Sequence, residues 1–249
     1  MRISNDLIKN GPTYLEQVLA SQLNPDLAES SDQLNKYNEL INRIEKDNLL
    51  KQKQSPIAKD FCLAHFYQKA ANVTADQSER TENLQSALKH YQHIIKKRST
   101  WGEEYFYACL SSGIIMQALG HPWPETEELL LLAHEANPLR GEPICRIIEY
   151  YLSIKSWPIA YIFSSFACDH FLDSCPPYEY WGIDQDFYTW KVLDLHITAA
   201  LAFGRVQEAS RSYIILYQKT IEHPELFSPG QIKTIVEKKG LFPKSTTYA

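Results

Sequence analysis

The chain has 249 residues, 44% of them hydrophobic, which is enough apolar material for a folded core in one or two domains. Its net charge of −5 gives no general basic surface for nucleic acid, and no uncharged apolar run is long enough to span a membrane. The first ten residues, MRISNDLIKN, lack the apolar stretch of a signal peptide, so we expect a soluble, cytoplasmic protein with no membrane or nucleic-acid partner.

Residues 1–56 differ in composition from the rest of the chain. They are rich in Asn, Gln, Asp, Lys and Ser and contain no Trp or Phe. A weak helix is predicted over 12–23, and a better one over 31–50, where apolar residues recur at helical spacing. Pro56 favours a break in front of it. We therefore predict a polar helical segment and linker over 1–56, a helical domain over 57–243 and a tail over 244–249.

From residue 58 onward, Tyr, Phe, Leu, Ile and Ala are dense, and Gly, Pro, Asn or Ser separate the apolar runs. No alternating apolar–polar pattern is long enough to require a strand, so the predicted fold class is all-α. The predicted helices cover 58–72, 80–97, 102–118, 124–136, 141–154, 158–172, 187–202, 206–221 and 229–238.

An internal repeat indicates how these helices are arranged. The dipeptide Trp-Pro at 123–124 occurs again at 157–158, 34 residues later, and Ala133 has its counterpart in Ala167 at the same distance. This is the period of tetratricopeptide repeats, which contain two antiparallel helices per unit. Pro is tolerated in the first turn of the second helix, and a small Ala lets the helix backbones approach. We predict antiparallel helix pairs stacked as a tetratricopeptide-like α-solenoid.

Further signals of this repeat are weaker. Gly113 lies on the first helix of a unit, which Leu119-Gly120 closes, and Phe203-Gly204 marks a third unit. About fifteen extra residues precede that third unit, and they read PPYEYWGIDQDFYTW over 176–190. The spacing therefore predicts an insertion rich in aromatic residues between the second and third units.

A family resemblance covers residues from about 125 to 243. The stretches that carry it are Asn137-Pro138-x-Arg140-x-Glu142-Pro143, Tyr150-Tyr151, Ala160-Tyr161, residues 184–190, and Gly204 with Ala209. This region resembles the helical-repeat segment that follows the catalytic domain in certain bacterial and viral glycosyltransferases. One departure is Leu195, because the family pattern usually has an acidic residue directly after the position of Asp194.

The resemblance does not extend to a catalytic domain. Residues 1–100 are too few and too helical for a nucleotide-sugar-binding α/β domain, which needs several strands with helices between them. The resemblance therefore implies an accessory module and does not imply transferase activity. The chain also has no Ser-His-Asp order, no glycine-rich phosphate loop and no HExxH motif, so we predict that it is not an enzyme.

Two acidic residues of the insertion, Asp184 and Asp186, match the acidic-x-acidic pair with which many glycosyltransferases hold a divalent cation. Two carboxylates alone are a weak signal, because a hard cation needs several oxygen ligands. Both residues precede a helix predicted to begin near Phe187, where carboxylates cap free N–H groups. Capping is the interpretation that we favour.

The aromatic residues of the insertion have two interpretations. They stack on a sugar or peptide, or they fill the gap where regular helix stacking is interrupted. Rings that point inward would make the insertion structural, whereas rings that face a groove beside Asp184 would favour binding. The residues concerned are Tyr178, Tyr180, Trp181, Phe187, Tyr188 and Trp190.

Four residues have zinc-ligand chemistry: Cys62 and His65 share one helix face, and so do His90 and His93. They would bind zinc only if two helices paired in the right register. The five cysteines are odd in number and irregularly spaced, which argues against a disulfide framework. We predict no metal and no cofactor.

The favoured function is a non-catalytic scaffold that binds a protein or peptide in a concave groove. We expect Arg140, Arg146 and Tyr151 to line that groove from first-helix positions. The alternative is an accessory module of a glycosylation system, whose partner is a glycosyltransferase or its glycosylated acceptor. Further contact residues would then come from the insertion, namely Tyr178, Tyr180, Trp181, Asp184 and Asp186.

Overall fold

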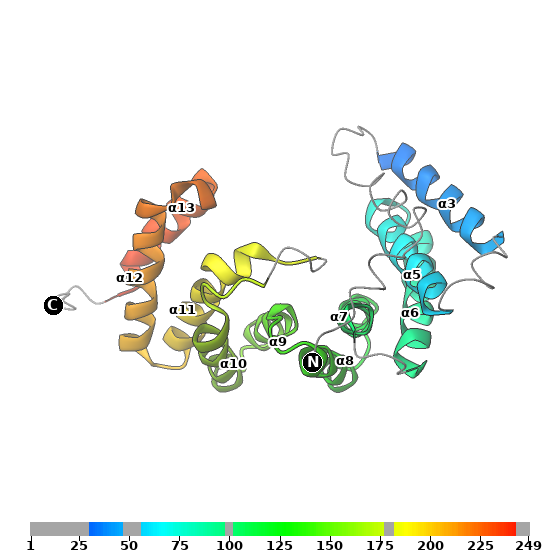
Figure 1. The fold of residues 1–249 in the computed structure, drawn as a ribbon. Helices are drawn as coiled ribbons and strands as arrows, with labels where there is room; N and C mark the ends of the chain where they lie inside the picture. Colours follow the sequence, from blue (N-terminus) through cyan, green and yellow to red (C-terminus); the bar gives the residue numbers. More distant parts are fainter. Residues whose placement is uncertain (1–29, 47–55, 98–101, 177–181, 243–249) are drawn as a thin grey trace. The chain divides into compact units, whose positions relative to one another are not determined.

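The computed structural model describes residues 30–46, 56–97, 102–176 and 182–242 (Figure 1). Within these ranges the protein has ten α-helices and no strand, which confirms the predicted all-α class. The chain divides into two compact units, unit 1 up to Ala87 and unit 2 from Leu88, and the division falls inside one helix.

Unit 1 contains α3 (Ser30–Lys46), α5 (Pro56–Val73) and the first part of α6 (Gln77–Lys97). Ile41 and Ile44 on α3 are buried in one small apolar core with Leu63 and Phe66 on α5. This shared core places α3 and α5 in the same unit, whereas composition had predicted a domain boundary between residues 56 and 57.

Unit 2 contains the remaining helices, and each of them packs against the next in chain order (Figure 1). All of them except α11 begin and end within one residue of their predicted ranges, because clear turn residues separate the apolar runs, and α11 begins five residues later than predicted. Their bounds are α7 (Glu103–Ala118), α8 (Trp123–Ala136), α9 (Glu142–Ser153), α10 (Trp157–Phe171), α11 (Val192–Ala202), α12 (Val206–Glu222) and α13 (Pro229–Glu237). The short 3-10 helices η2 (Pro224–Leu226) and η3 (Lys238–Leu241) follow α12 and α13.

The Trp-Pro repeat has the structural role that its chemistry predicts. Trp123 and Trp157 are the first residues of α8 and α10, so each following proline lies in the first helical turn, where its missing N–H leaves no bond unmade. Ala133 and Ala167 are completely buried, which allows neighbouring helices to approach closely. These two pairs, α7–α8 and α9–α10, therefore share the features that predicted them.

A common turn joins the two helices within each pair. Gly120, Lys155 and Gly204 have positive φ angles of 76°, 59° and 84°, which is the backbone conformation of a glycine helix cap. The next N–H in each turn donates to a carbonyl five residues earlier. These bonds are His121 N to Met116 O (3.0 Å), Ser156 N to Tyr151 O (2.9 Å) and Arg205 N to Ala200 O (2.7 Å). Three successive helix pairs, the last being α11–α12, thus have the same corner.

The described part of the insertion ends in the π-helical segment η1 (Phe187–Lys191), which continues directly into α11. The N–H of Val192 donates to the carbonyl of Phe187, five residues earlier. The helix predicted over 187–202 is therefore confirmed, and its first turn is wider than a normal α-helical turn.

Among the described helices, none is both long and apolar enough to cross a lipid bilayer. Of the five cysteines, Cys62, Cys109 and Cys145 are buried, Cys168 is half-buried and Cys175 is exposed.

Candidate functional site

A buried ionic network lies at the corner that precedes α9. The Nε of Arg140 donates to Glu142 Oε2 at 2.9 Å, and one terminal nitrogen donates to Glu103 Oε1 at 2.6 Å. A longer bond of 3.4 Å reaches the carbonyl of Gly182, and the guanidinium lies 4.4 Å from the centre of the Phe106 ring. Arg140 is 0% exposed and lies between α8 and α9. It is therefore inaccessible to a partner and does not line an open groove as the repeat had predicted.

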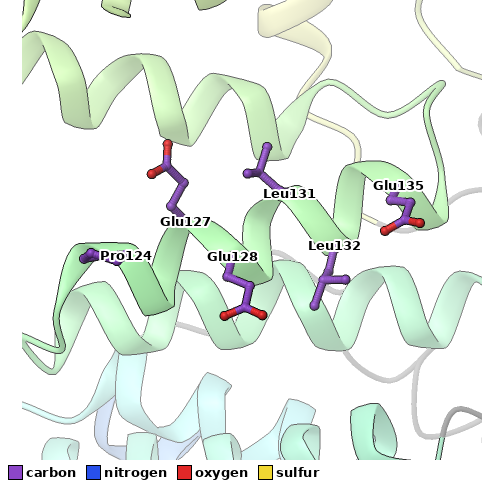
Figure 2. Close-up of a pocket in the computed structure, with 6 residues that line it drawn as sticks. All are labelled: Pro124, Glu127, Glu128, Leu131, Leu132 and Glu135. Atoms are coloured by element: carbon purple, nitrogen blue, oxygen red, sulfur yellow. The ribbon is translucent and has the colours of Figure 1, made fainter.

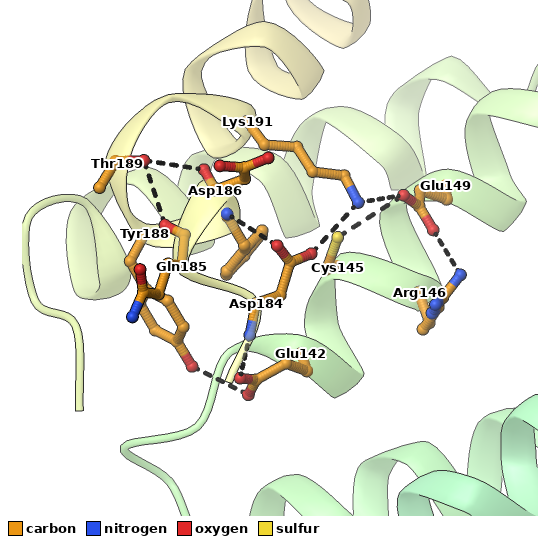
Figure 3. Close-up of polar contacts among 11 residues, drawn as sticks. Glu142, Cys145, Arg146, Glu149, Asp184, Gln185, Asp186, Tyr188, Thr189 and Lys191 are labelled. Carbon is orange, nitrogen blue, oxygen red and sulfur yellow. Dashed lines mark hydrogen bonds and ion pairs between the residues drawn. The ribbon is translucent and has the colours of Figure 1, made fainter. Parts of the chain in front are cut away.

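Tyr188 fastens the insertion to this corner (Figure 3). Its hydroxyl donates to Glu142 Oε2 at 2.9 Å and accepts a bond of 2.8 Å from the N–H of Gly141. The N–H of Asp184 donates to the other carboxylate oxygen of Glu142 at 3.2 Å. The start of α9 thus holds the insertion at two points, one through a side chain and one through the backbone.

The protonation states of Arg140 and Tyr188 depend on their burial and on the neighbouring carboxylates. Burial opposes the charged form of Arg140, but Glu142 and Glu103 hold its pKa above the ordinary value. Burial, followed by the charge of Glu142, raises the pKa of Tyr188, so its hydroxyl remains a donor. The bonds that Glu142 accepts from Tyr188 and Asp184, and the bond from Arg140 to Gly182, join this corner to the insertion, so we infer a structural role for the network.

A second row of charges is half exposed and runs from α9 to the insertion (Figure 3). Arg146 contacts Glu149 at 3.3 Å, Lys191 contacts the other oxygen of Glu149 at 2.7 Å, and Lys191 also lies 3.5 Å from Asp184. The side chains of Arg146 and Asp184 are 45% and 40% exposed. The structure therefore brings two predicted contact residues into one charged row, which we call the α9 charge row (Arg146, Glu149, Lys191 and Asp184).

The two aspartates of the insertion have different roles. Asp184 accepts a long hydrogen bond of 3.4 Å from the N–H of Phe187, so its carboxylate caps the helix as expected. The side chain of Asp186 makes no such capping bond and is exposed. Within the ranges that the structure describes, no group of three or more His, Cys, Asp or Glu side chains is arranged to hold a metal ion.

The zinc-type residues divide between the two units. Cys62 and His65 belong to unit 1, whereas His90 and His93 belong to unit 2. Burial and the charge of Lys69 lower the pKa of His65 to about 4, so this side chain is neutral at pH 7.

The described aromatic residues of the insertion point into the protein. Phe187 and Tyr188 are completely buried, with ring centres 6.0 and 6.3 Å from that of Phe171. The Trp190 ring centre lies 5.9 Å from that of Phe227. Phe187 and Tyr188 therefore fill the interior, and Trp190 is half-buried against the same core, which favours the structural interpretation for these described rings. Tyr178, Tyr180 and Trp181 lie outside the described residues.

Tyr151 belongs to the contact between α9 and α8. Its hydroxyl donates to both carboxylate oxygens of Glu127, at 3.0 and 3.1 Å, and its ring meets that of Trp123 edge-on. Trp123 itself stacks on Tyr150 with ring centres 3.5 Å apart. Tyr151 is therefore half-buried in this contact, and Arg146 is the more exposed of the residues predicted to line the groove.

A shallow groove on α8 was not predicted from the sequence (Figure 2). It has a volume of about 330 Å³, and its lining residues recur at helical spacing along one helix. The described residues that line it are Pro124, Glu127, Glu128, Leu131, Leu132 and Glu135. The pattern Glu-x-x-Leu-Leu-x-x-Glu over 128–135 is the signal that could have revealed it, because it places two carboxylates around an apolar centre on one face.

The sequence matches no protein-family model, and comparisons with curated proteins and with solved structures give no match either. The resemblance to glycosyltransferase-associated helical repeats therefore remains a prediction.

Proposed function

We propose that unit 2 is a tetratricopeptide-like α-solenoid that acts in the cytoplasm as a non-catalytic scaffold. In this proposal the first helices of the pairs, α7, α9 and α11, line a concave groove that binds a protein or peptide. Three corners with the same backbone hydrogen bond support a repeated helix pair as the building unit of this solenoid.

The observation that carries the proposal is the α9 charge row. Ion pairs that are this exposed contribute only about 0–1 kcal/mol to stability, so the row contributes little to the fold. Pre-arranged charges of both signs suit the orientation of a polar partner, because each can exchange an internal pair for one with the partner. The row also spans α9 and the insertion, which gives a partner two separate elements to contact.

Site-specific photo-crosslinking tests which helices face the partner. A photoreactive amino acid would replace Arg146 on α9 or Thr198 on α11, and Asp169 on α10 or Arg211 on α12 as matched exposed controls. We expect a discrete crosslinked partner from positions 146 and 198 and little product from 169 and 211. Equal crosslinking from all four positions, or none from the first two, would contradict binding by the first helices.

As an alternative, we propose an accessory role in glycosylation, in which the insertion contacts a glycosyltransferase or a glycosylated acceptor. The supporting observation is that the corner before α9 anchors the insertion while Asp184 and Asp186 stay accessible. Affinity purification would compare the wild type with a Tyr178→Ala/Trp181→Ala variant. Recovery of a glycosyltransferase or glycosylated protein that is lost in the variant supports this role. An unrelated partner recovered equally from both proteins leaves the general scaffold.

A further inference from the structure

We propose that the groove on α8 binds a helix of a partner protein that carries Lys or Arg on both sides of a pair of leucine-like residues. This site is on the second helix of its pair, so it goes beyond the first-helix groove proposed above. The crosslinking experiment changes residues on other helices, so either proposal can fail while the other holds.

The spacing of the lining residues defines the partner. Glu128 and Glu135 are seven residues apart, which is about 10 Å along the helix axis, and Leu131 and Leu132 lie between them. A partner helix aligned with α8 matches this arrangement with basic residues at positions i and i+7 and apolar residues at i+3 and i+4. The part of α8 that lines the groove, from residue 124 to 135, is about three helical turns long.

The charge of α8 favours a basic partner. The helix contains Glu125, Glu127, Glu128 and Glu135 and has no Lys or Arg. Burial lowers the pKa of His134, so this histidine does not offset the negative charge at neutral pH. Within the described parts of the chain, neither Glu128 nor Glu135 forms an ion pair with a basic side chain.

Some of these charges oppose the stability of the helix itself, although Glu125 lies in the first turn, where the helix dipole favours a carboxylate. Glu125 and Glu128 repel each other at i, i+3 spacing, and Glu135 lies in the last turn, where the helix dipole disfavours a carboxylate. A basic partner would remove both penalties. This contrasts with the α9 charge row, whose acidic side chains Glu149 and Asp184 each already have a basic neighbour.

The centre of the groove is apolar. Leu131 is 42% exposed, and Leu132 beside it is half-buried and packs against the core of unit 2. A single exposed leucine is ordinary on a protein surface. Here it lies in a hollow between two carboxylates, so an apolar side chain flanked by basic ones can fill the hollow and pair both charges at once.

Binding of a synthetic helix to the full chain tests the proposal. The probe is a fluorescent, alanine-based peptide with Lys at i and i+7 and Leu at i+3 and i+4. It has about 18 residues, a length at which an isolated helix can form. We expect saturable binding that weakens as salt increases, since exposed charges are screened. In the Glu128→Lys/Glu135→Lys variant we expect a Kd about tenfold higher or more, and in Leu131→Ser a Kd several-fold higher.

Two controls make the result specific. The Glu104→Lys/Glu222→Lys variant has the same change in net charge on exposed positions of α7 and α12, and it should bind like the wild type. A probe with Glu in place of Lys should bind the Glu128→Lys/Glu135→Lys variant better than it binds the wild type. Equal loss of binding in both charge variants, no saturable binding to the wild type, or no rescue by the acidic probe would overturn the proposal. Analytical ultracentrifugation would detect a different occupant, namely a second copy of the chain. The groove would be assigned to that copy if the wild type self-associates and only the Glu128→Lys/Glu135→Lys variant does not.

Discussion

Arg140 and Glu142 form a buried ion pair at 2.9 Å, and the hydroxyl of Tyr188 donates to the same carboxylate oxygen. The Arg140 side chain is 0% exposed and that of Glu142 is 8% exposed, so neither charge has much water around it. Such a pair is costly to break on one side only, because the remaining charge stays buried without compensation.

We therefore expect Arg140→Met to lower the free energy of unfolding by about 3–5 kcal/mol. Adding Glu142→Gln should restore part of this loss, since the double variant no longer buries an unpaired carboxylate. Urea denaturation of the wild type, both single variants and the double variant gives the coupling energy. As a control, Arg146→Met removes a half-exposed pair and should cost at most about 1 kcal/mol. Additive effects of the two buried substitutions would refute the coupling.

The insertion packs tightly against Gly141. A Cβ atom added there would overlap the ring of Phe187 and lie 3.0 Å from the ring of Phe171. Gly141→Ala should therefore destabilise the protein by about 1–3 kcal/mol through overpacking. The matched control is Gly230→Ala on α13, where nothing lies within 4 Å and the change should be neutral or slightly stabilising. Thermal unfolding of both variants makes the comparison, and equal stability of the two would contradict the predicted packing.

The corner at Lys155 has a backbone conformation that suits glycine. Its φ of 59° is unfavourable for a residue with a Cβ, whereas the equivalent Gly120 and Gly204 avoid this cost. We expect Lys155→Gly to stabilise the protein by about 0.5–1 kcal/mol after the entropy of the added glycine is counted. Gly204→Ala should destabilise it by about 1 kcal/mol. Calorimetry measures both changes as shifts of the Tm in opposite directions, and a decrease in both variants would argue against this account.

His196 gives the protein a predictable pH dependence. The side chain is 6% exposed, and its Nδ1 lies 3.1 Å from the hydroxyl of Ser164. Burial lowers the pKa of His196, although Glu208 and Asp169 act in the opposite direction. The folded pKa is thus below the unfolded value of about 6.5, so this contribution to stability is fully present above pH 6.5 and is lost as pH falls through the folded value.

We expect the free energy of unfolding to decrease between about pH 7.5 and pH 5.5. In His196→Asn the decrease should be smaller, because the unfolded state no longer gains a proton at this position. The difference between the two proteins at each pH isolates His196, since other titrating groups such as Glu103, whose pKa burial raises, are present in both. Parallel pH profiles would show that His196 does not contribute.

Most of the helices of unit 2 could be predicted, because their ends carry strong local signals. Trp-Pro marks the starts of α8 and α10, and Gly120 and Gly204 mark two corners. The buried position of Arg140 could not be predicted, since its partners Glu103 and Gly182 are 37 and 42 residues away in the sequence. Helical periodicity predicts which side of a helix a residue occupies. Arg140 lies in the connection between α8 and α9, so periodicity does not predict whether its side chain is buried.

The groove on α8 illustrates a different limit. Its residues are visible as a pattern in the sequence, but the same pattern also suits a face that another helix covers. Leu132 packs against the core while the adjacent Leu131 is 42% exposed, and this difference depends on where the neighbouring helices lie. The sequence predicts which residues share a face, and packing decides which face remains open.

The corner before α9 also affects how the protein folds. In a simple repeat array each unit contacts only its neighbours, so unfolding can begin at an end and proceed unit by unit. Here Arg140 joins the start of α7 to the insertion that precedes α11, and Tyr188 bonds to the start of α9 from 47 residues away. These contacts form only when parts of three successive pairs are together. We therefore expect the segment from α7 to α11 to lose its protection against hydrogen exchange in one cooperative step, without fraying from either end.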